Sequence, residues 1–209
     1  MQLQRLELTG SAGSIEAVRS LPDAGAPQRG VAVIAHPHPL FGGTMDNKVV
    51  QTLARAFVAC GFAAVRFNFR GVGGSGGSYD AGQGEQRDML DVVRQVAADG
   101  PLALAGFSFG AFVASHVLQM LWNERQPTHA VLVGTAASRF DAAQVPEAAR
   151  MRTLVVHGES DDVVPLAAVL DWARPQLLPV TVVPGGEHFF HGQLPLLKGL
   201  VTRHLQAAF

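Results

Sequence analysis

The pentapeptide Gly106-Phe107-Ser108-Phe109-Gly110 (GFSFG) decides the fold of this chain. The apolar run PLALA (101–105) precedes it, and AFVASHVLQML (111–121) follows it with helical spacing. A serine flanked at two residues' distance by glycines, between a strand and a helix, is typical of a sharp turn that holds the serine at positive φ. Side chains in place of Gly106 and Gly110 would collide with that turn. The turn would present the Ser108 hydroxyl above the sheet edge, at the start of a helix.

Short apolar segments recur on both sides of this turn and predict strands. Continuous apolar runs indicate strands that are covered on both faces, and therefore a parallel sheet. Before them, residues 2–9 and 14–21 alternate polar and apolar side chains, which predicts an antiparallel hairpin. The predicted parallel strands are VAVIA (31–35), AAVRFNF (63–69), LALAG (102–106), AVLVG (130–134), TLVVH (153–157) and VTVV (180–183).

Segments with helical spacing separate these strands. In residues 85–99, for example, Met89, Val92 and Val93 recur at the spacing of one helix face. Strands that alternate with helices predict a doubly wound α/β fold with a mostly parallel central sheet. A length of 209 residues suits one domain, and neither an internal repeat nor a second domain is visible, so we expect residues 1–209 to form a single domain. The predicted helices span residues 47–61, 85–99, 109–123 and 194–209.

The composition excludes several classes of protein. Hydrophobic residues make up 48% and charged residues 16%, and 16 basic against 17 acidic side chains give a net charge of -1. The sequence lacks the basic stripe that is typical of nucleic-acid-binding proteins. No window approaches the roughly 18 apolar residues of a membrane span. The N-terminus MQLQRLELTGSAGS lacks the features of a signal peptide. The single cysteine, Cys60, excludes an internal disulfide, which suits a reducing compartment, and we expect it to be a buried, inert thiol. Together these observations predict a soluble, cytoplasmic protein.

A reactive serine needs a base, and the base needs an acid that orients it. In this kind of fold the partners follow in the order Ser, Asp or Glu, His. HGESDDVVP (157–165) follows a strand and offers Asp161 and Asp162; adjacent side chains point apart, so one of them can face a histidine, and we favour Asp161. GGEHFFHG (185–192) follows the last strand, and there we favour His188 over His191.

The negative oxygen that forms in such a reaction needs N–H donors. One donor is expected to be the backbone N–H of Phe109, the residue after the serine. The second should come from HPHPLFGGT (36–44), the loop after the first parallel strand. Pro37 and Pro39 have no N–H to donate. That leaves His38 or Leu40, and we favour Leu40.

These motifs, together with AHPHPLFGGTMDNKVV (35–50) and NFRGVGGSGG (68–77), resemble the α/β-hydrolase superfamily over nearly the whole chain. Within it, they resemble a group of small bacterial hydrolases near the dienelactone-hydrolase-like and carboxylesterase branches. The resemblance implies Ser108 as nucleophile, Asp161 as acid and His188 as base, with no cofactor. Residues 135–152, between two predicted strands, are too few for a helical cap domain, so we expect a lidless, open site.

The function that follows is a serine hydrolase that cleaves small carboxylic esters or thioesters through an acyl-enzyme. Lactone and peptide cleavage use the same machinery, so the sequence does not select the substrate class. It also does not indicate an oligomeric state. Five phenylalanines surround the motifs and suggest either an apolar substrate pocket or core packing: Phe41, Phe107, Phe109, Phe189 and Phe190.

A metal-dependent hydrolase is the first alternative. His36 and His38 after a strand could join Asp161 and His188 as metal ligands. The interposed prolines and the complete serine set disfavour this hypothesis, so we expect no metal.

Two further alternatives carry other functions. GVGGSG (71–76) matches a dinucleotide-binding fingerprint, but no helix opens directly after it, and the Gly-Lys-Ser/Thr of a phosphate-binding P-loop is absent. A non-catalytic binding module on the same fold is the last alternative, and it is disfavoured because nucleophile and base are both present.

Overall fold

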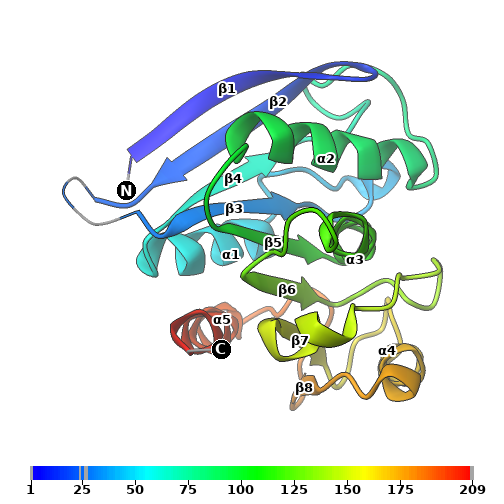
Figure 1. Cartoon of the computed structure of the whole chain (residues 1–209). Coiled ribbons are helices and arrows are strands. Elements are labelled where there is room, and N and C mark those ends of the chain that lie inside the picture. Colours follow the sequence, from blue (N-terminus) through cyan, green and yellow to red (C-terminus); the bar gives the residue numbers. More distant parts are fainter. Residues whose placement is uncertain (1, 24, 26–27, 208–209) are drawn as a thin grey trace.

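The computed structural model describes residues 2–23, 25 and 28–207. Its strands form one sheet in the order β1-β2-β4-β3-β5-β6-β7-β8 (Figure 1). β1 and β2 are antiparallel, β2 is antiparallel to β4, and the other neighbours are parallel. The predicted mostly parallel sheet with an N-terminal hairpin is therefore confirmed. The strands are β1 Gln2–Gly10, β2 Gly13–Leu21, β3 Gly30–Ala35, β4 Phe62–Phe67, β5 Leu102–Phe107, β6 His129–Val133, β7 Thr153–Gly158 and β8 Val180–Val183.

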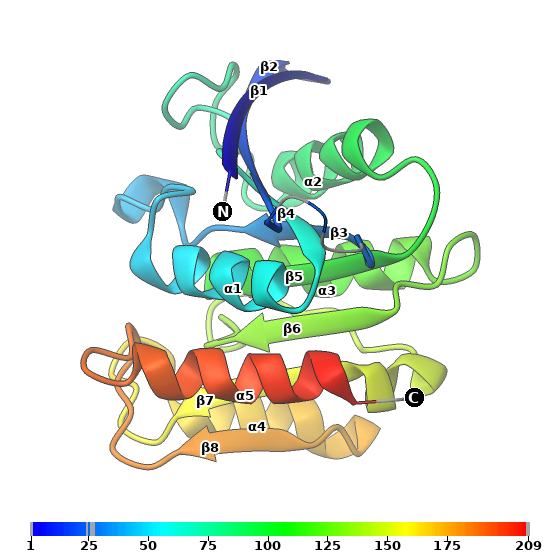
Figure 2. The ribbon, with the colours of Figure 1, turned by 90° about the vertical axis from the view of Figure 1, so that its left-hand side faces the viewer.

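Helices cover both faces of the sheet, as a doubly wound fold requires. α1 (Lys48–Ala59) and α5 (Leu194–Gln206) lie on one face, which Figure 2 shows in front. α2 (Gln83–Val96), α3 (Phe109–Leu121) and α4 (Leu166–Ala173) pack on the other face. The central strands β3, β4, β5 and β6 are buried throughout, because they contribute apolar side chains to both cores.

Some boundaries differ from the predicted ones for local reasons. β4 ends at Phe67 instead of residue 69, because the Asn68 side chain leaves the strand to accept from Met45 N–H and donate to Glu16. α2 ends at Val96, three residues early. α4 was not predicted, since its eight residues are too short and too uniformly apolar to show a helical period. The predicted last helix ends at Gln206, and residues 208–209 lie outside the described part.

The carboxyl edge of the parallel strands is open. Between β6 and β7, residues 134–152 contain one short 3-10 helix, η2 (Glu147–Arg152), and no cap domain. The expected lidless architecture is therefore present. Loops that leave the ends of β3, β5, β6, β7 and β8 meet at this edge, where open α/β sheets bind their ligands.

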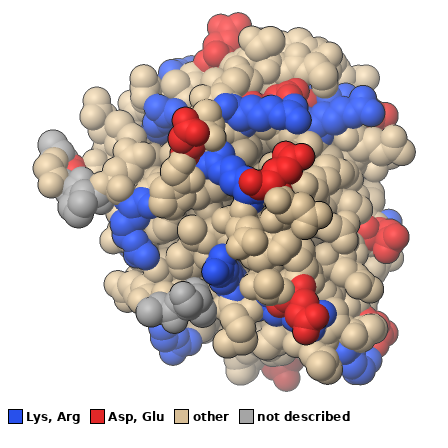
Figure 3. Space-filling model, in the orientation of Figure 1, with Lys and Arg blue, Asp and Glu red and all other residues tan. Residues whose placement is uncertain are grey.

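The surface carries both signs of charge. On the face drawn in Figure 3, basic and acidic side chains are interspersed. In the described part of the chain, no helix combines the length and the apolar character needed to cross a bilayer. Cys60 is buried, and this burial raises the pKa of its thiol, which is the environment of an inert cysteine.

Candidate active site

The turn between β5 and α3 holds Ser108 at φ 56° and ψ -116°, the strained backbone that its sequence context predicted. A Cβ atom on Gly106 would overlap the Gly110 carbonyl, and one on Gly110 would overlap the Ala35 carbonyl. The Ser108 N–H donates to Val133 O at 2.8 Å. Steric necessity and this tie to β6 therefore fix the direction of the serine side chain.

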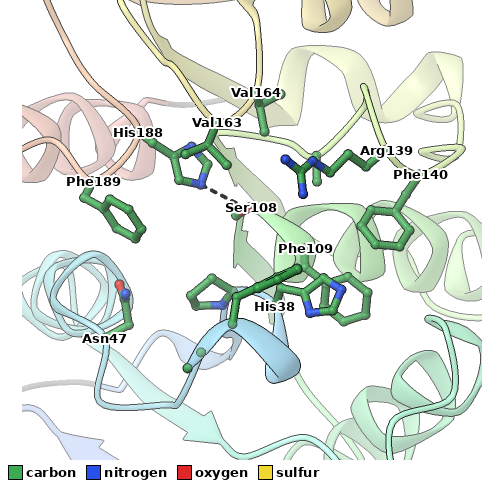
Figure 4. Close-up of a pocket in the computed structure, with 15 residues that line it drawn as sticks. His38, Asn47, Ser108, Phe109, Arg139, Phe140, Val163, Val164, His188 and Phe189 are labelled. Atoms are coloured by element: carbon green, nitrogen blue, oxygen red, sulfur yellow. Dashed lines mark hydrogen bonds between the residues drawn. The ribbon is translucent and has the colours of Figure 1, made fainter.

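Ser108, His188 and Asp161 form a hydrogen-bonded chain. His188 Nε2 lies 3.0 Å from Ser108 Oγ, the contact drawn as a dashed line in Figure 4. His188 Nδ1 lies 2.7 Å from Asp161 Oδ2. The three residues follow β5, β8 and β7, so the shared carboxyl edge brings together side chains from distant parts of the sequence.

Asp161 is held as an ionised carboxylate. Its Oδ1 accepts from the N–H groups of Val163 at 3.0 Å and Val164 at 2.7 Å. Burial by itself would raise the pKa of this carboxyl, but the hydrogen bonds from His188 and Val164, together with the electrostatic effect of His188 and His157, outweigh it, and the pKa lies below its ordinary value. The carboxylate is therefore oriented by its own turn and left with one oxygen for the imidazole.

The neighbouring candidates do not join this chain. Asp162 is exposed, and no hydrogen bond joins its side chain to His188 within the described residues. His191 is exposed, and its Nδ1 lies 2.8 Å from Glu187 Oε1 on the same loop. The structure thus brings Asp161 and His188, the favoured members of each pair, to the serine.

His157 is a buried residue of this site that the sequence did not single out. Its Nε2 lies 2.9 Å from Val164 O and 3.5 Å from Asp161 Oδ2. Burial lowers the pKa of this imidazole, so the ring is neutral and Nε2–H is the donor. His157 therefore stabilises the turn that holds Asp161 through its hydrogen bond to Val164 O. Its only signal in the sequence was its place four residues before Asp161.

The loop after β3 contains both candidate donors, the backbone N–H groups of Leu40 and His38, and only the first of them is already hydrogen-bonded within the described residues. The Leu40 N–H donates to Nδ1 of His38, the N-cap residue of the 3-10 helix η1 (Pro39–Phe41), at 3.2 Å, and Leu40 is 67% exposed. His38 lines the cavity, and within the described residues its backbone N–H has no acceptor. Phe109 is the first residue of α3, so its N–H precedes the intrahelical bonds. The expectation for Leu40 does not fit this arrangement, because its N–H is already satisfied.

A cavity of about 370 Å³ opens beside Ser108. Of the five phenylalanines that the sequence suggested, Phe107 and Phe190 are fully buried in the core beneath α1 and α5. The other three line the cavity, together with residues that the sequence did not point to. The lining consists of Pro37, His38, Phe41, Gly42, Gly43, Asn47, Ser108, Phe109, Ala136, Arg139, Phe140, Val163, Val164, His188 and Phe189.

His36 serves the loop and not the cavity. Its Nδ1 lies 2.6 Å from Pro37 O, and its Nε2 accepts from Phe69 N–H at 3.0 Å. Burial lowers the pKa of this ring to about 4. Across residues 2–23, 25 and 28–207, no group of three or more His, Cys, Asp or Glu side chains is arranged to hold a metal ion. The four side chains of the metal hypothesis are therefore not gathered.

The glycine-rich loop at residues 71–76 packs against the hairpin. Gly74 N–H donates to Glu16 Oε2 at 2.8 Å, and Gly76 N–H donates to Ser14 O at 2.8 Å. None of its residues lines the cavity. The loop therefore packs against β2 and lies outside the cavity.

A known family matches this architecture. The family model of the X-Pro dipeptidyl-peptidases (S15 family) matches residues 14–145, a region that contains Ser108 and ends before Asp161. The chain belongs to this S15 family. Its fold and family make it an α/β hydrolase.

Solved structures resemble this S15-family chain along its full length. A serine hydrolase without lid from Xanthomonas campestris is 36% identical, has a TM-score of 0.87, and is matched over 98% of its length by 100% of this chain. A serine hydrolase homologue from Coxiella burnetii is 36% identical with a TM-score of 0.82, over 98% of each chain. An uncharacterised protein of Rickettsia prowazekii is 28% identical over 202 residues, which are 90% of this chain and 82% of that protein.

Proposed function

We propose that this α/β hydrolase cleaves small carboxylic esters, or thioesters, through an acyl-enzyme formed on Ser108. The observation that carries the proposal is the hydrogen-bonded chain from Ser108 Oγ through His188 to Asp161 at the open sheet edge. A serine becomes a nucleophile when a base can take its proton and an acid fixes the base. These three residues form the proposed catalytic triad.

The proposed reaction has two halves. His188 Nε2 takes the Ser108 proton while Oγ attacks the carbonyl carbon, and the same imidazolium then protonates the leaving alcohol or thiol. Water enters next, loses a proton to His188, and attacks the acyl carbon, so that the acid is released and Ser108 regains its proton. Asp161 accepts from Nδ1–H throughout, which selects the productive tautomer and stabilises the imidazolium.

The backbone N–H groups of Phe109 and His38 are proposed to bind the oxyanion. His38 replaces Leu40 in this role because it lines the cavity, whereas the Leu40 N–H is donated to the His38 ring. His38 has φ -53° and lies between two prolines, so its backbone has little freedom. A preorganised donor of this kind stabilises the developing charge without reorganisation.

Peptide cleavage is the second candidate function, and the S15-family match is the observation that favours it. An X-Pro dipeptidyl-peptidase substrate carries its N-terminal ammonium group on the dipeptide that is released. No Asp or Glu lines the cavity in the described part, and Arg139, its charged residue, would repel an ammonium group. The ester hypothesis therefore ranks first.

A substrate panel tests the proposal. Purified enzyme would be assayed with p-nitrophenyl acetate and butyrate, butyryl-CoA, and an X-Pro p-nitroanilide, each with and without EDTA. We expect ester turnover that EDTA does not change and that Ser108→Ala abolishes, with exposed Ser78→Ala as the matched control. Cleavage of the anilide alone would favour the peptidase. Loss of activity in EDTA would favour a metal-dependent hydrolase, and inertness toward all four would leave the binding-module hypothesis.

A further inference from the structure

The segment after β6 places Arg139 next to the nucleophile. Ala136 N–H donates to the Ser108 carbonyl at 3.4 Å, and Arg139 N–H donates back to Ala136 O at 3.2 Å. The next residue, Phe140, packs its ring 5.1 Å from that of Phe109 and 4.9 Å from that of Phe112. The Arg139 backbone is thus anchored one turn away from the reactive serine.

The Arg139 side chain points into the cavity. Figure 4 shows its guanidinium directed toward Ser108, across from Asn47 and Phe189. Arg66 and Arg70, by comparison, pair with Asp46 and Asp88. No hydrogen bond or ion pair is formed by the Arg139 guanidinium with any residue that the structure describes.

The charge of Arg139 lies in a cavity whose other walls are mostly apolar. Its wall is mostly aromatic and aliphatic, and none of its described lining residues is an Asp or Glu. The field of Arg139 reaches the loop opposite, since after burial it is the next cause that lowers the pKa of His38. A planar guanidinium matches a carboxylate through two parallel N–H···O bonds. A ligand carboxylate is therefore the group that would satisfy it.

We propose that Arg139 is a specificity-determining residue that binds a carboxylate on the substrate, so that the preferred substrates are esters with a free carboxylate. This inference rests on the proposed esterase function and names its substrate class. The carboxylate could belong to the acyl part or to the alcohol part of the ester, and separate arms of the experiment distinguish the two. Because Arg139 is exposed at the cavity mouth, its substitution leaves the core intact.

The experiment compares charged and neutral esters of matched length. The acyl arm uses mono-p-nitrophenyl adipate against p-nitrophenyl hexanoate, and the alcohol arm uses 4-carboxyphenyl hexanoate against 4-carbamoylphenyl hexanoate. In at least one arm the wild type should have the higher kcat/KM for the charged ester. Arg139→Gln should lower that value by about tenfold to a hundredfold, mainly through KM, since a charge-assisted bidentate contact is lost. The neutral esters should be unaffected.

Three controls bear on the interpretation. Arg139→Lys keeps the charge without the planar fork and should restore part of the preference. Arg87→Gln removes an exposed arginine outside the cavity and should leave the preference unchanged, which excludes an effect of net charge. The preference should also shrink as NaCl screens the guanidinium.

Equal effects of Arg139→Gln on charged and neutral esters, or no preference in either arm, would overturn the inference and leave the esterase proposal intact. Absence of all ester turnover would instead refute the esterase proposal. In that event, calorimetric titration with monomethyl adipate and methyl hexanoate decides the inference separately. Tighter binding of the adipate that Arg139→Gln removes supports a carboxylate site, and equal binding of the two ligands rejects it.

Discussion

Ser108 Oγ lies 3.0 Å from His188 Nε2, although the two residues are 80 positions apart in the sequence. Two loop contacts produce this proximity. The loop after β8 is tied to the loop after β7 by Ser160 N–H, which donates to Gly186 O at 2.8 Å. A Cβ atom on Gly134 would lie 3.3 Å from the His188 ring, so the absence of a side chain at this position leaves room for the imidazole. The loops that carry Asp161 and His188 are therefore tied to each other.

The acid can be tested against its own neighbour. Asp161→Asn should lower kcat for p-nitrophenyl butyrate by about 10⁴-fold, because an amide favours the wrong imidazole tautomer. Asp162→Asn, at an exposed position one residue away, should keep wild-type turnover. Steady-state kinetics of the two variants measure the difference. A larger loss in Asp162→Asn would mean that the acid is misassigned.

The second oxyanion donor can be tested by removing one hydrogen atom. His38 has φ -53°, which proline can adopt, so His38→Pro deletes the backbone N–H without requiring a new backbone conformation. His38→Ala loses the same ring and keeps the N–H. Relative to His38→Ala, the proline variant should lose about a hundredfold to a thousandfold in kcat. Equal kcat values for the two variants would exclude the His38 N–H as a donor.

Acid should weaken the fold through His36. Its pKa is about 4 in the folded protein, because burial disfavours the charged ring, against 6.5 as its ordinary value. Between these values the unfolded chain binds a proton that the folded chain does not, so the free energy of unfolding falls as the pH drops from 6.5 toward 4. Protonation would also place a hydrogen on Nε2, which accepts from Phe69 N–H.

Urea unfolding at pH 7 and pH 5 measures this effect. His36→Gln offers an acceptor for Phe69 N–H that does not titrate. Its free energy of unfolding should fall less than that of the wild type between the two pH values, by about 1–2 kcal/mol. His191→Gln, at an exposed position, serves as the control and should behave like the wild type. Identical pH dependence in His36→Gln would show that His36 does not couple folding to protons.

The sequence predicted those parts of the site that local sterics and strand order determine. The glycine spacing around Ser108 requires a tight turn, and a turn between a buried strand and a helix fixes where the hydroxyl points. Asp161 and His188 could be placed because the carboxyl ends of parallel strands share an edge. The resemblance to the α/β-hydrolase superfamily pointed to the same three residues.

Other features depend on side-chain directions that spacing does not encode. His38 turns its ring back onto the Leu40 N–H, and this occupies the donor that the sequence favoured. Phe107 and Phe109 are two residues apart, yet one packs beneath α1 and α5 and the other lines the cavity, because the turn at Ser108 interrupts the strand alternation. Arg139 enters the site through a loop without a motif, so its sequence carried no signal.

Covalent labelling tests the central claim most directly. A fluorophosphonate probe reacts with an activated serine by forming an O–P bond as fluoride leaves, and intact-mass and peptide mass spectrometry then locate the adduct. The account predicts one adduct on Ser108, none in Ser108→Ala, and strongly slowed labelling in His188→Ala. Labelling of Ser108→Ala at the wild-type rate, or an unlabelled wild-type Ser108, would contradict it.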